Sequence, residues 1–520
     1  TTEIYTLSLH DALPIYSQVT VTDVLSSSAA NSLPYSEMDI YNDGSYTNWA
    51  DLILQNGLSQ NYEISTSGGN EKTNFNISLG TMFEQGLLRN DELDRYNVKV
   101  NVDHKASKIV KVGTSLLYTY KNHDKRTNVF GQALKMTSIA HPYDADGNII
   151  LKPSPTYEAH ANPLLDEVPG NFQNNIESTR FFGNAYIEIT PIKSIMFKSM
   201  FALDRNEFRD GLYQDYQSVG KLQSASGSYI SVDNNTKTGY TWENTLNYNT
   251  DFGGSKSNLT GLLGHSMTQG VTEYRSVSGN TAAEHYYTSS FYDLTRITTP
   301  VLDNGYSKSS ILSFFGRVNY RYLDKYLLTA SVRADGSSVL ADGHKWGYFP
   351  SLSLAWRLNE ESFLKGTSWL DNLKARASWG LSGNAAVDAY GTLTTVSNSS
   401  SFPVYYYLNN KEYSGNIPNT LGNKDLSWEK TSALNFGLDF GVLKNRISGS
   451  VDVYFSNTYD LLYMRSLPAS NVFTQVLDNI GETKGSGVEL SLNTIIVNSK
   501  DFKWDVNWTA SFSKDEITKL

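Results

Sequence analysis

The side chains that most often carry catalysis are missing or scattered in this sequence. The chain has 520 residues and no cysteine, which excludes a cysteine nucleophile, a disulfide framework and a cysteine-based zinc site. Its eight histidines show no metal-binding spacing such as HExxH. No serine sits in the strand–turn–helix context of a nucleophile elbow, and no pair of carboxylates stands out. We therefore expect no catalytic residues, no metal site, no cofactor and no enzyme activity.

One acidic segment is similar to the start of a calcium-binding loop. Residues 144–148 read DADGN, which places oxygen side chains at alternate positions. The EF-hand pattern also needs a late glutamate and further oxygen ligands, but its ninth and twelfth positions would be Leu151 and Ser154. A hairpin turn inside a long connection is the favoured interpretation.

Three consecutive tyrosines are the best candidates for binding a substrate. Tyr405, Tyr406 and Tyr407 lie in a long polar connection. Aromatic faces stack on sugar rings or on partner side chains, and tyrosine is enriched at interfaces. The alternative is a strand that extends above a membrane, where tyrosine is also common.

The composition is typical of strands and turns. Aromatic residues make up 12% of the chain and charged residues 18%, with 38 glycines and only 13 prolines. The net charge of −10, without a basic run, argues against binding to nucleic acid. The sequence contains no run of about 18 apolar residues, so no membrane-spanning helix is predicted. This does not argue against a membrane barrel, because hydropathy averages miss its strands.

Apolar and polar residues alternate along many segments. From position 447 to 455, the odd positions read I, G, V, V and F, whereas positions 446 to 454 read R, S, S, D and Y at the even numbers. The same period of two runs through 373–381, 434–442 and 503–513. Each of these segments is therefore predicted to be a strand with one apolar face and one polar face.

Sixteen such strands can be placed along the chain. The predicted strands are 60–68, 72–83, 95–105, 110–121, 181–190, 194–205, 239–249, 257–269, 310–322, 326–335, 347–357, 372–382, 430–441, 446–457, 485–496 and 502–514. Tight turns and long connections alternate between them, and 358–371 is predicted to hold a short helix. The long connections are 122–180, 206–238, 270–309, 383–429 and 458–484.

This alternation of turn lengths distinguishes between fold classes. A soluble sandwich also alternates apolar and polar residues, but it has no reason to keep all long loops at one end. A propeller would show a repeat the length of a blade, and none is found. Outer-membrane barrels have short periplasmic turns and long outer loops, with aromatic residues at the interfaces. Aromatic residues near predicted strand ends fit such a girdle: Tyr326, Tyr348, Trp356, Trp379 and Trp504.

Three stretches resemble the SusC/RagA family of TonB-dependent outer-membrane transporters of Bacteroidetes. They are 60–105, beginning QNYEISTSGGNEKTNFNISLG, 331–384, beginning SVRADGSSVLADGHKWGYFPSLSLAWRLN, and 423–494, which runs from NKDLSWEKTSALNFGLDF to DNIGETKGSGVELSLNT. The similarity is ordered along nearly the whole chain after about residue 30.

The resemblance implies a fold and a mechanism. Such transporters form a barrel of about 22 strands with a plugged lumen. A TonB box before the plug binds the TonB complex, and a SusD-like surface lipoprotein acts as a lid. The substrates are oligosaccharides or peptides. The plug, TonB box and signal peptide are not visible here, so the expected fold is an all-β, antiparallel transmembrane β-barrel of outer-membrane type, incomplete at about 16 of about 22 strands. We expect the protein to lie in the bacterial outer membrane and to contact its lipid.

Three regions are expected in the chain. Residues 1–20 are interpreted as a non-native or disordered segment that packs against no other element. The reason is that Thr6 to Ile15 resembles a translated sequencing adapter. The alternative is that these residues are a natural short segment. Residues 21–59 are interpreted as a barrel-edge or extracellular segment, and 60–520 as the partial barrel.

Two other functions remain open. One is a surface adhesion or binding protein that works through its long loops, and the other is a passive porin. In each case we expect a curled sheet that does not close, with edge strands near 60–68 and 502–514.

Overall fold

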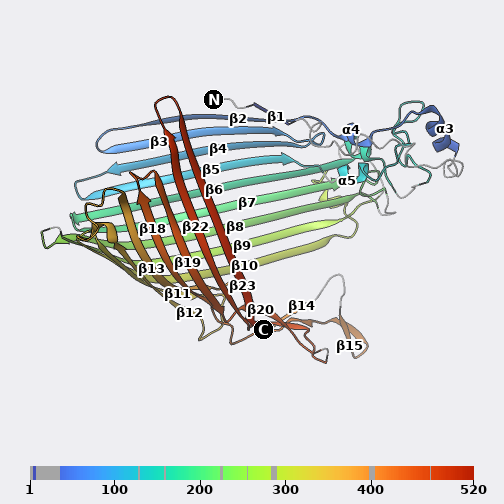
Figure 1. Cartoon of the computed structure of the whole chain (residues 1–520). Coiled ribbons are helices and arrows are strands. Elements are labelled where there is room, and N and C mark those ends of the chain that lie inside the picture. Colours follow the sequence, from blue (N-terminus) through green and yellow to red (C-terminus); the bar gives the residue numbers. More distant parts are fainter. Residues whose placement is uncertain are drawn as a thin grey trace.

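The computed structural model of the chain describes residues 4–7, 35–126, 129–156, 160–222, 227–254, 256–282, 290–397, 404–468 and 470–520. One large antiparallel sheet dominates it (Figure 1). Sixteen consecutive strands pair in chain order, and the short strand β1 (Ile4–Leu7) adds to one end. The predicted all-β class and strand number are therefore confirmed.

The strands of the sheet follow the predicted segments closely. They are β2 (Gly57–Gly69), β3 (Thr73–Gln85), β4 (Glu92–Lys105), β5 (Val110–Asp124), β6 (Phe172–Ile192), β7 (Ile195–Gln214), β8 (Tyr229–Phe252), β9 (Ser257–Asn280), β10 (Val301–Tyr322), β11 (Tyr326–Ser337), β12 (Trp346–Arg357), β13 (Leu370–Asn384), β18 (Glu429–Val442), β19 (Ile447–Tyr459), β22 (Glu482–Asn498) and β23 (Lys503–Lys519). The predicted short helix in 358–371 is the single 3₁₀ turn η4 (Leu358–Glu360).

The main difference from the prediction is the length of β6 to β10. These strands have 20 to 24 residues, so much of the predicted connections 122–180, 206–238 and 270–309 is strand. The apolar alternation stops where the strands would leave a membrane, but their backbone ladder continues because neighbouring polar strands still satisfy each other's hydrogen bonds. Sequence alternation therefore detects the membrane-crossing part and misses the polar extension.

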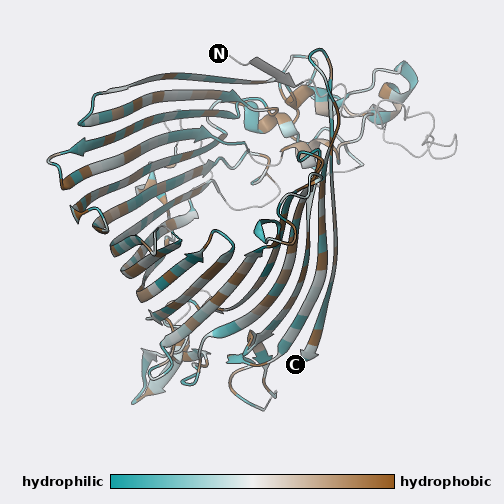
Figure 2. Cartoon of the chain, turned by 60° about the vertical axis from the view of Figure 1, so that its left-hand side comes forward, coloured by the Kyte–Doolittle hydropathy of each residue, from teal (hydrophilic) through white to brown (hydrophobic). Residues whose placement is uncertain are grey.

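The sheet curls without closing (Figure 2). Among the described residues, β23 pairs only with β22, and no pairing joins β23 to β2. The predicted edge at β23 is confirmed, whereas the edge of β2 is partly covered, because Ile4–Leu7 pair with the residues from Gly57 to Gln60. The expectation that the first twenty residues contact no other element is wrong for this strand, since an exposed edge offers free backbone groups to any extended segment. The rest of Thr6 to Ile15 lies outside the described residues.

The segment before β2 and the long connections carry small elements of their own. The helices are α3 (Tyr35–Asp43), α4 (Trp49–Ile53), α5 (Val129–Ala133), η2 (Pro163–Glu167) and η3 (Leu294–Arg296), and the loop strands are β14 (Thr395–Ser397), β15 (Tyr405–Leu408), β16 (Lys411–Ser414), β17 (Ile417–Thr420), β20 (Leu462–Ser466) and β21 (Gln475–Asn479). Buried Trp49 and Ile53 of α4 pack with Val129 and Leu164 from the β5–β6 connection. The carboxylate of Glu37 accepts hydrogen bonds from the same connection. The segment before β2 is thus held against a long loop.

Candidate functional site

The two faces of the sheet differ along its whole length. In the register of β18 and β19, Leu434, Phe436 and Leu438 stand opposite Phe455, Val453 and Val451 on one face. These side chains are partly or largely exposed, and Phe436 keeps 48% of its surface open. The hydropathy colouring of Figure 2 shows brown and teal alternating along the strands. The predicted apolar and polar faces are confirmed.

Aromatic residues mark the short-turn end of the apolar face. The rings of Tyr322, Tyr326 and Trp356 form a stacked row with centroids 6.3 Å apart at each step. Glu361, in the connection after β12, accepts hydrogen bonds from Tyr326 Oη at 2.6 Å and Trp356 Nε1 at 3.1 Å. It also pairs with Lys325 Nζ at 3.0 Å. One carboxylate therefore fixes two girdle rings, which the sequence did not reveal because the acceptor lies in a loop.

The Glu361 carboxylate is strongly stabilised in its charged form. Hydrogen bonds from Tyr326, Lys325 and Trp356 lower the pKa of Glu361 from 4.5 to about 2. Tyr348, Trp379 and Trp504, the other residues of the predicted girdle, are all exposed. Trp379 Nε1 donates to Ser432 Oγ at 3.0 Å.

Charged residues on the polar face pair with one another. Arg376 donates to both oxygens of Asp439, at 2.7 and 2.9 Å, and contacts Asp452 at 3.0 Å. A side chain at Gly437 would overlap the guanidinium of Arg376, so glycine leaves room for this network. Elsewhere in the sheet, Arg333 pairs with Asp335 on β11 at 2.7 Å. Such pairs are typical of the wall of a polar lumen.

A shallow recess lies on the polar face of the long strands β6 to β9. It has a volume of about 390 Å³ and is lined by residues of β6 to β9, including Arg180, Asp204, Lys237, Gly239 and Gly270. Arg180 holds Asp204 through two hydrogen bonds of 2.9 and 2.7 Å. Neighbouring side chains leave the space above Gly239 open. The recess offers hydrogen-bonding groups to a polar solute, without any arrangement that resembles catalysis.

Two of the sequence motifs meet in the long-loop region. Phe349 of the WGYFPS stretch and Trp428 of the NKDLSWE stretch are both buried in one cluster with Leu340 and Leu426. The ring centroids of Phe349 and Trp428 are 5.3 Å apart with an interplanar angle of 69°. Trp428 Nε1 also donates to the carbonyl of Lys345 at 2.9 Å. These two motifs therefore build the packed core of the long-loop region.

The tyrosine triplet lies on an exposed hairpin. Tyr405, Tyr406 and Tyr407 form strand β15, which pairs with β16 and projects from the long-loop end (Figure 1). Tyr406 stacks on Tyr413 with centroids 5.4 Å apart, and Tyr407 Oη donates to Glu412 at 2.6 Å. Tyr407 is 72% exposed. Both interpretations of the triplet are compatible with this geometry, because it is a strand above the sheet and also an open aromatic surface.

The DADGN segment forms a turn. Asp144 Oδ1 accepts from the backbone N–H groups of Asp146 and Asn148 at 2.9 and 2.8 Å, and Tyr143 pairs with Ile149 across the hairpin. The predicted hairpin turn is confirmed. Hydrogen bonds from the side-chain amide and then the backbone N–H of Asn148 lower the pKa of Asp144.

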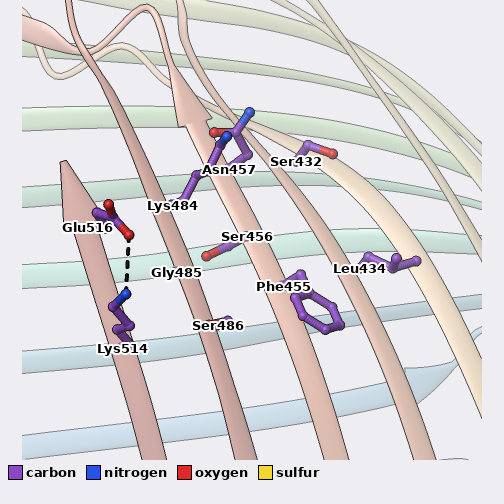
Figure 3. A pocket seen from close by; sticks show the side chains of 10 residues that line it. All are labelled: Ser432, Leu434, Phe455, Ser456, Asn457, Lys484, Gly485, Ser486, Lys514 and Glu516. Atoms are coloured by element: carbon purple, nitrogen blue, oxygen red, sulfur yellow. Dashed lines mark hydrogen bonds and ion pairs between the residues drawn. The ribbon is translucent and has the colours of Figure 1, made fainter. Parts of the chain in front are cut away.

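A second recess lies on the apolar face near the edge of the sheet. It has a volume of about 430 Å³, and ten residues of β18, β19, β22 and β23 line it. Figure 3 shows Lys484 and Asn457 near one end and Phe455 and Leu434 beside them. Lys514 and Glu516 form an ion pair of 3.3 Å on β23. Charged groups on this face were not predicted from the sequence as a site.

No helix in the part of the chain that the structure describes has the length and apolar character to cross a bilayer.

Comparisons with known proteins agree with this architecture. The family model described as TonB dependent receptor-like, beta-barrel matches residues 18–519. TonB-dependent receptor P26 of Formosa agariphila is 29% identical over 479 residues, which are 91% of this chain and 47% of that protein. TonB-dependent receptor SusC of Bacteroides thetaiotaomicron is 29% identical over 508 residues, covering 91% and 48%. The chain thus spans about half the length of these relatives.

Solved structures show the same fold. The structure of the RagAB peptide transporter superposes with a TM-score of 0.77 at 25% identity, covering 91% of this chain and 53% of that one. The outer membrane transporter YddB from Escherichia coli superposes with a TM-score of 0.56 at 11% identity, covering 89% and 55%, and is similar in fold alone. The resemblance inferred from the motifs is confirmed: the chain belongs to the TonB-dependent receptor β-barrel family, is of the SusC/RagA type, and is a protein of the bacterial outer membrane.

Proposed function

We propose that this chain is the barrel portion of an outer-membrane importer of oligosaccharides or peptides. The observation that carries the proposal is one continuous sheet with an apolar face for lipid and an ion-paired polar face, matched over residues 18–519 by the TonB-dependent receptor barrel. Similarity to the RagAB peptide transporter supports import of peptides, and the resemblance to the SusC/RagA family implies oligosaccharides as the other substrate class. The polar recess beside Lys237 and Gly239 offers hydrogen-bonding groups to a polar solute.

The proposed importer works with two partners. A SusD-like surface lipoprotein covers the long-loop end, and the TonB complex supplies the energy. The relative named TonB-dependent receptor SusC supports the TonB assignment, and the resemblance to the SusC/RagA family implies the lipoprotein. In this orientation the long loops point outward and the short turns face the periplasm, as in other outer-membrane barrels. The protein is not an enzyme and needs no cofactor.

Tyr405, Tyr406 and Tyr407 are the proposed contact with the substrate or with the lid. They lie on a hairpin outside the sheet, and the face formed by Tyr405 and Tyr407 is open. Exposed aromatic rings bind sugar rings and apolar side chains at little cost in conformational entropy. Residues 1–20 are proposed to be a non-native segment, and residues 21–59 a barrel-edge or extracellular segment.

Deletion of the gene in its host tests the main proposal. We expect the mutant to lose uptake of labelled oligosaccharide or peptide, and we expect deletion of TonB to give the same loss. A passive porin would continue to work without TonB, and an adhesin would lose surface binding without any change in uptake. Either result would refute energised import.

Genomic sequencing across the region before residue 20 tests the boundaries. We expect the reading frame upstream of the barrel to encode a plug and a TonB box, and the adapter-like residues to be absent. A genomic frame that contains Thr6 to Ile15 unchanged would contradict the assignment of residues 1–20.

A further inference from the structure

Polar residues interrupt the apolar face where four strands approach the long loops. From the long-loop end downward, three successive rows across β18, β19, β22 and β23 are Ser432–Asn457–Lys484–Glu516, Leu434–Phe455–Ser486–Lys514 and Phe436–Val453–Val488–Phe512. The third row is wholly apolar and the first wholly polar. The change takes place within two residues of each strand, which locates the boundary between the hydrocarbon and the headgroups of a membrane.

The charges at this boundary are unequal. Lys484 and Lys514 face the recess together with Glu516. Lys514 Nζ lies 3.3 Å from Glu516, whereas Lys484 is exposed and forms no ion pair within the part of the chain that the structure describes. Two cations and one anion leave one positive charge, and an ammonium group has three donors, so Lys514 can serve a second acceptor while it contacts Glu516.

The floor of the recess is apolar. Phe455 is 49% exposed and Leu434 is 36% exposed, and both contribute to its lining. The small residues Gly485 and Ser486 separate them from Lys514, as Figure 3 shows. The volume of about 430 Å³ suffices for a headgroup with the upper part of one acyl chain.

We infer that this recess binds the phosphorylated headgroup of a lipid in the outer leaflet. The phosphate would accept hydrogen bonds from Lys484 and Lys514, and the chain would descend over Phe455 and Leu434. Lysine is an effective partner for phosphate as a compact point charge, and its attraction to an anionic headgroup adds to apolar burial. Asn457 and Ser432 supply further polar groups at the same level.

Glu516 gives the proposal a distinctive signature. A carboxylate beside the phosphate repels it and competes for Lys514, so its neutralisation should strengthen binding while neutralisation of a lysine weakens it. If the lysines only extended from the apolar face toward water, the glutamate and lysine substitutions would not change lipid affinity in opposite directions.

The test titrates lipid A carrying two phosphates into the detergent-solubilised receptor that contains this chain, with occupancy read by native mass spectrometry. The variants are Lys484→Gln, Lys514→Gln and Glu516→Gln. Lys500→Gln is the matched control, because Lys500 lies in the turn at the opposite end of the same β22–β23 hairpin. Thermal unfolding of each variant establishes that it is folded.

We expect each lysine variant to bind about five-fold more weakly, Glu516→Gln to bind more tightly, and Lys500→Gln to match the parent. Dephosphorylated lipid A should bind weakly to all of them. Equal binding by Lys484→Gln and Glu516→Gln would overturn the proposal. Equal binding of the dephosphorylated lipid would overturn it in favour of a purely apolar groove, and full displacement by millimolar inorganic phosphate would overturn it in favour of a site for soluble anions.

Discussion

Phe349 packs edge-on against Trp428, with ring centroids 5.3 Å apart, and this contact joins β12 to the segment that enters β18. Two glycines make the contact possible. A Cβ atom at Gly347 or Gly383 would overlap the ring of Phe349. The loop core, which is the buried cluster of Leu340, Phe349, Leu426 and Trp428, therefore depends on the two glycines as much as on the aromatic rings.

Gly383→Ala should destabilise this loop core. The added methyl group must displace Phe349 or bend β13, and overpacking of this kind costs about 1–3 kcal/mol. The midpoint of thermal unfolding measures the effect. Gly239→Ala is the matched control, because its nearest neighbour would lie 3.8 Å from the new Cβ, and it should change stability little. Equal losses in both variants would contradict the role of the Phe349 contact.

Acid should weaken the hydrogen bonds that Tyr326, Trp356 and Lys325 donate to the Glu361 carboxylate. The pKa of Glu361 is lowered to about 2 in the folded protein, so its carboxylate stabilises the fold fully above its ordinary pKa of 4.5. This stabilisation is lost as the pH falls from 4.5 toward 2, because the folded state must then bind a proton at an unfavourable site. Thermal unfolding followed across this range should show the loss.

Glu361→Gln removes this titration. Its unfolding midpoint should be lower than that of the parent at neutral pH and should fall less steeply below pH 4.5. The intrinsic fluorescence of Trp356 should also change, since its Nε1–H loses the charged acceptor at 3.1 Å. Parallel pH profiles in the two proteins would show that Glu361 does not hold the girdle.

Substitution by lysine at two adjacent positions of β19 should lower the free energy of unfolding by very different amounts. Val451 lies on the apolar face between Leu438 and Leu490, whereas Ser450 lies on the polar face opposite Asp439. Val451→Lys should cost about 2–4 kcal/mol if it lies near the middle of the bilayer, and Ser450→Lys should be tolerated. Folding into lipid vesicles under increasing urea measures both. The opposite order would mean that the two faces are assigned wrongly.

Loss of the exposed tyrosines should affect binding without affecting stability. Tyr405→Ala and Tyr407→Ala remove rings that are 50% and 72% exposed, so unfolding should change by less than about 0.5 kcal/mol. Binding of the proposed oligosaccharide or peptide substrate, or of the proposed SusD-like lipoprotein, should weaken by several-fold, as measured by calorimetry. Tyr463→Ala, on the separate β20–β21 hairpin and 56% exposed, is the control. Unchanged binding in both triplet variants would refute the proposed contact.

The sequence by itself determined the number of strands, their faces and the family. Alternation such as that of 446–455 reports directly on the two environments of a strand, because successive side chains point to opposite faces. The DADGN turn was also predictable, since its hydrogen bonds are local.

Only the tertiary structure decided which distant residues meet. The contacts of Glu361 with Tyr326 and of Phe349 with Trp428 depend on the path of a loop, and the placement of Lys484 beside Glu516 on the neighbouring strand depends on strand register. The polar extensions of β6 to β10 were also missed, because beyond the membrane both faces of a strand are wet and alternation disappears while the backbone ladder continues. Periodicity reveals the environment of a strand, whereas a site forms only where the register aligns side chains from several strands.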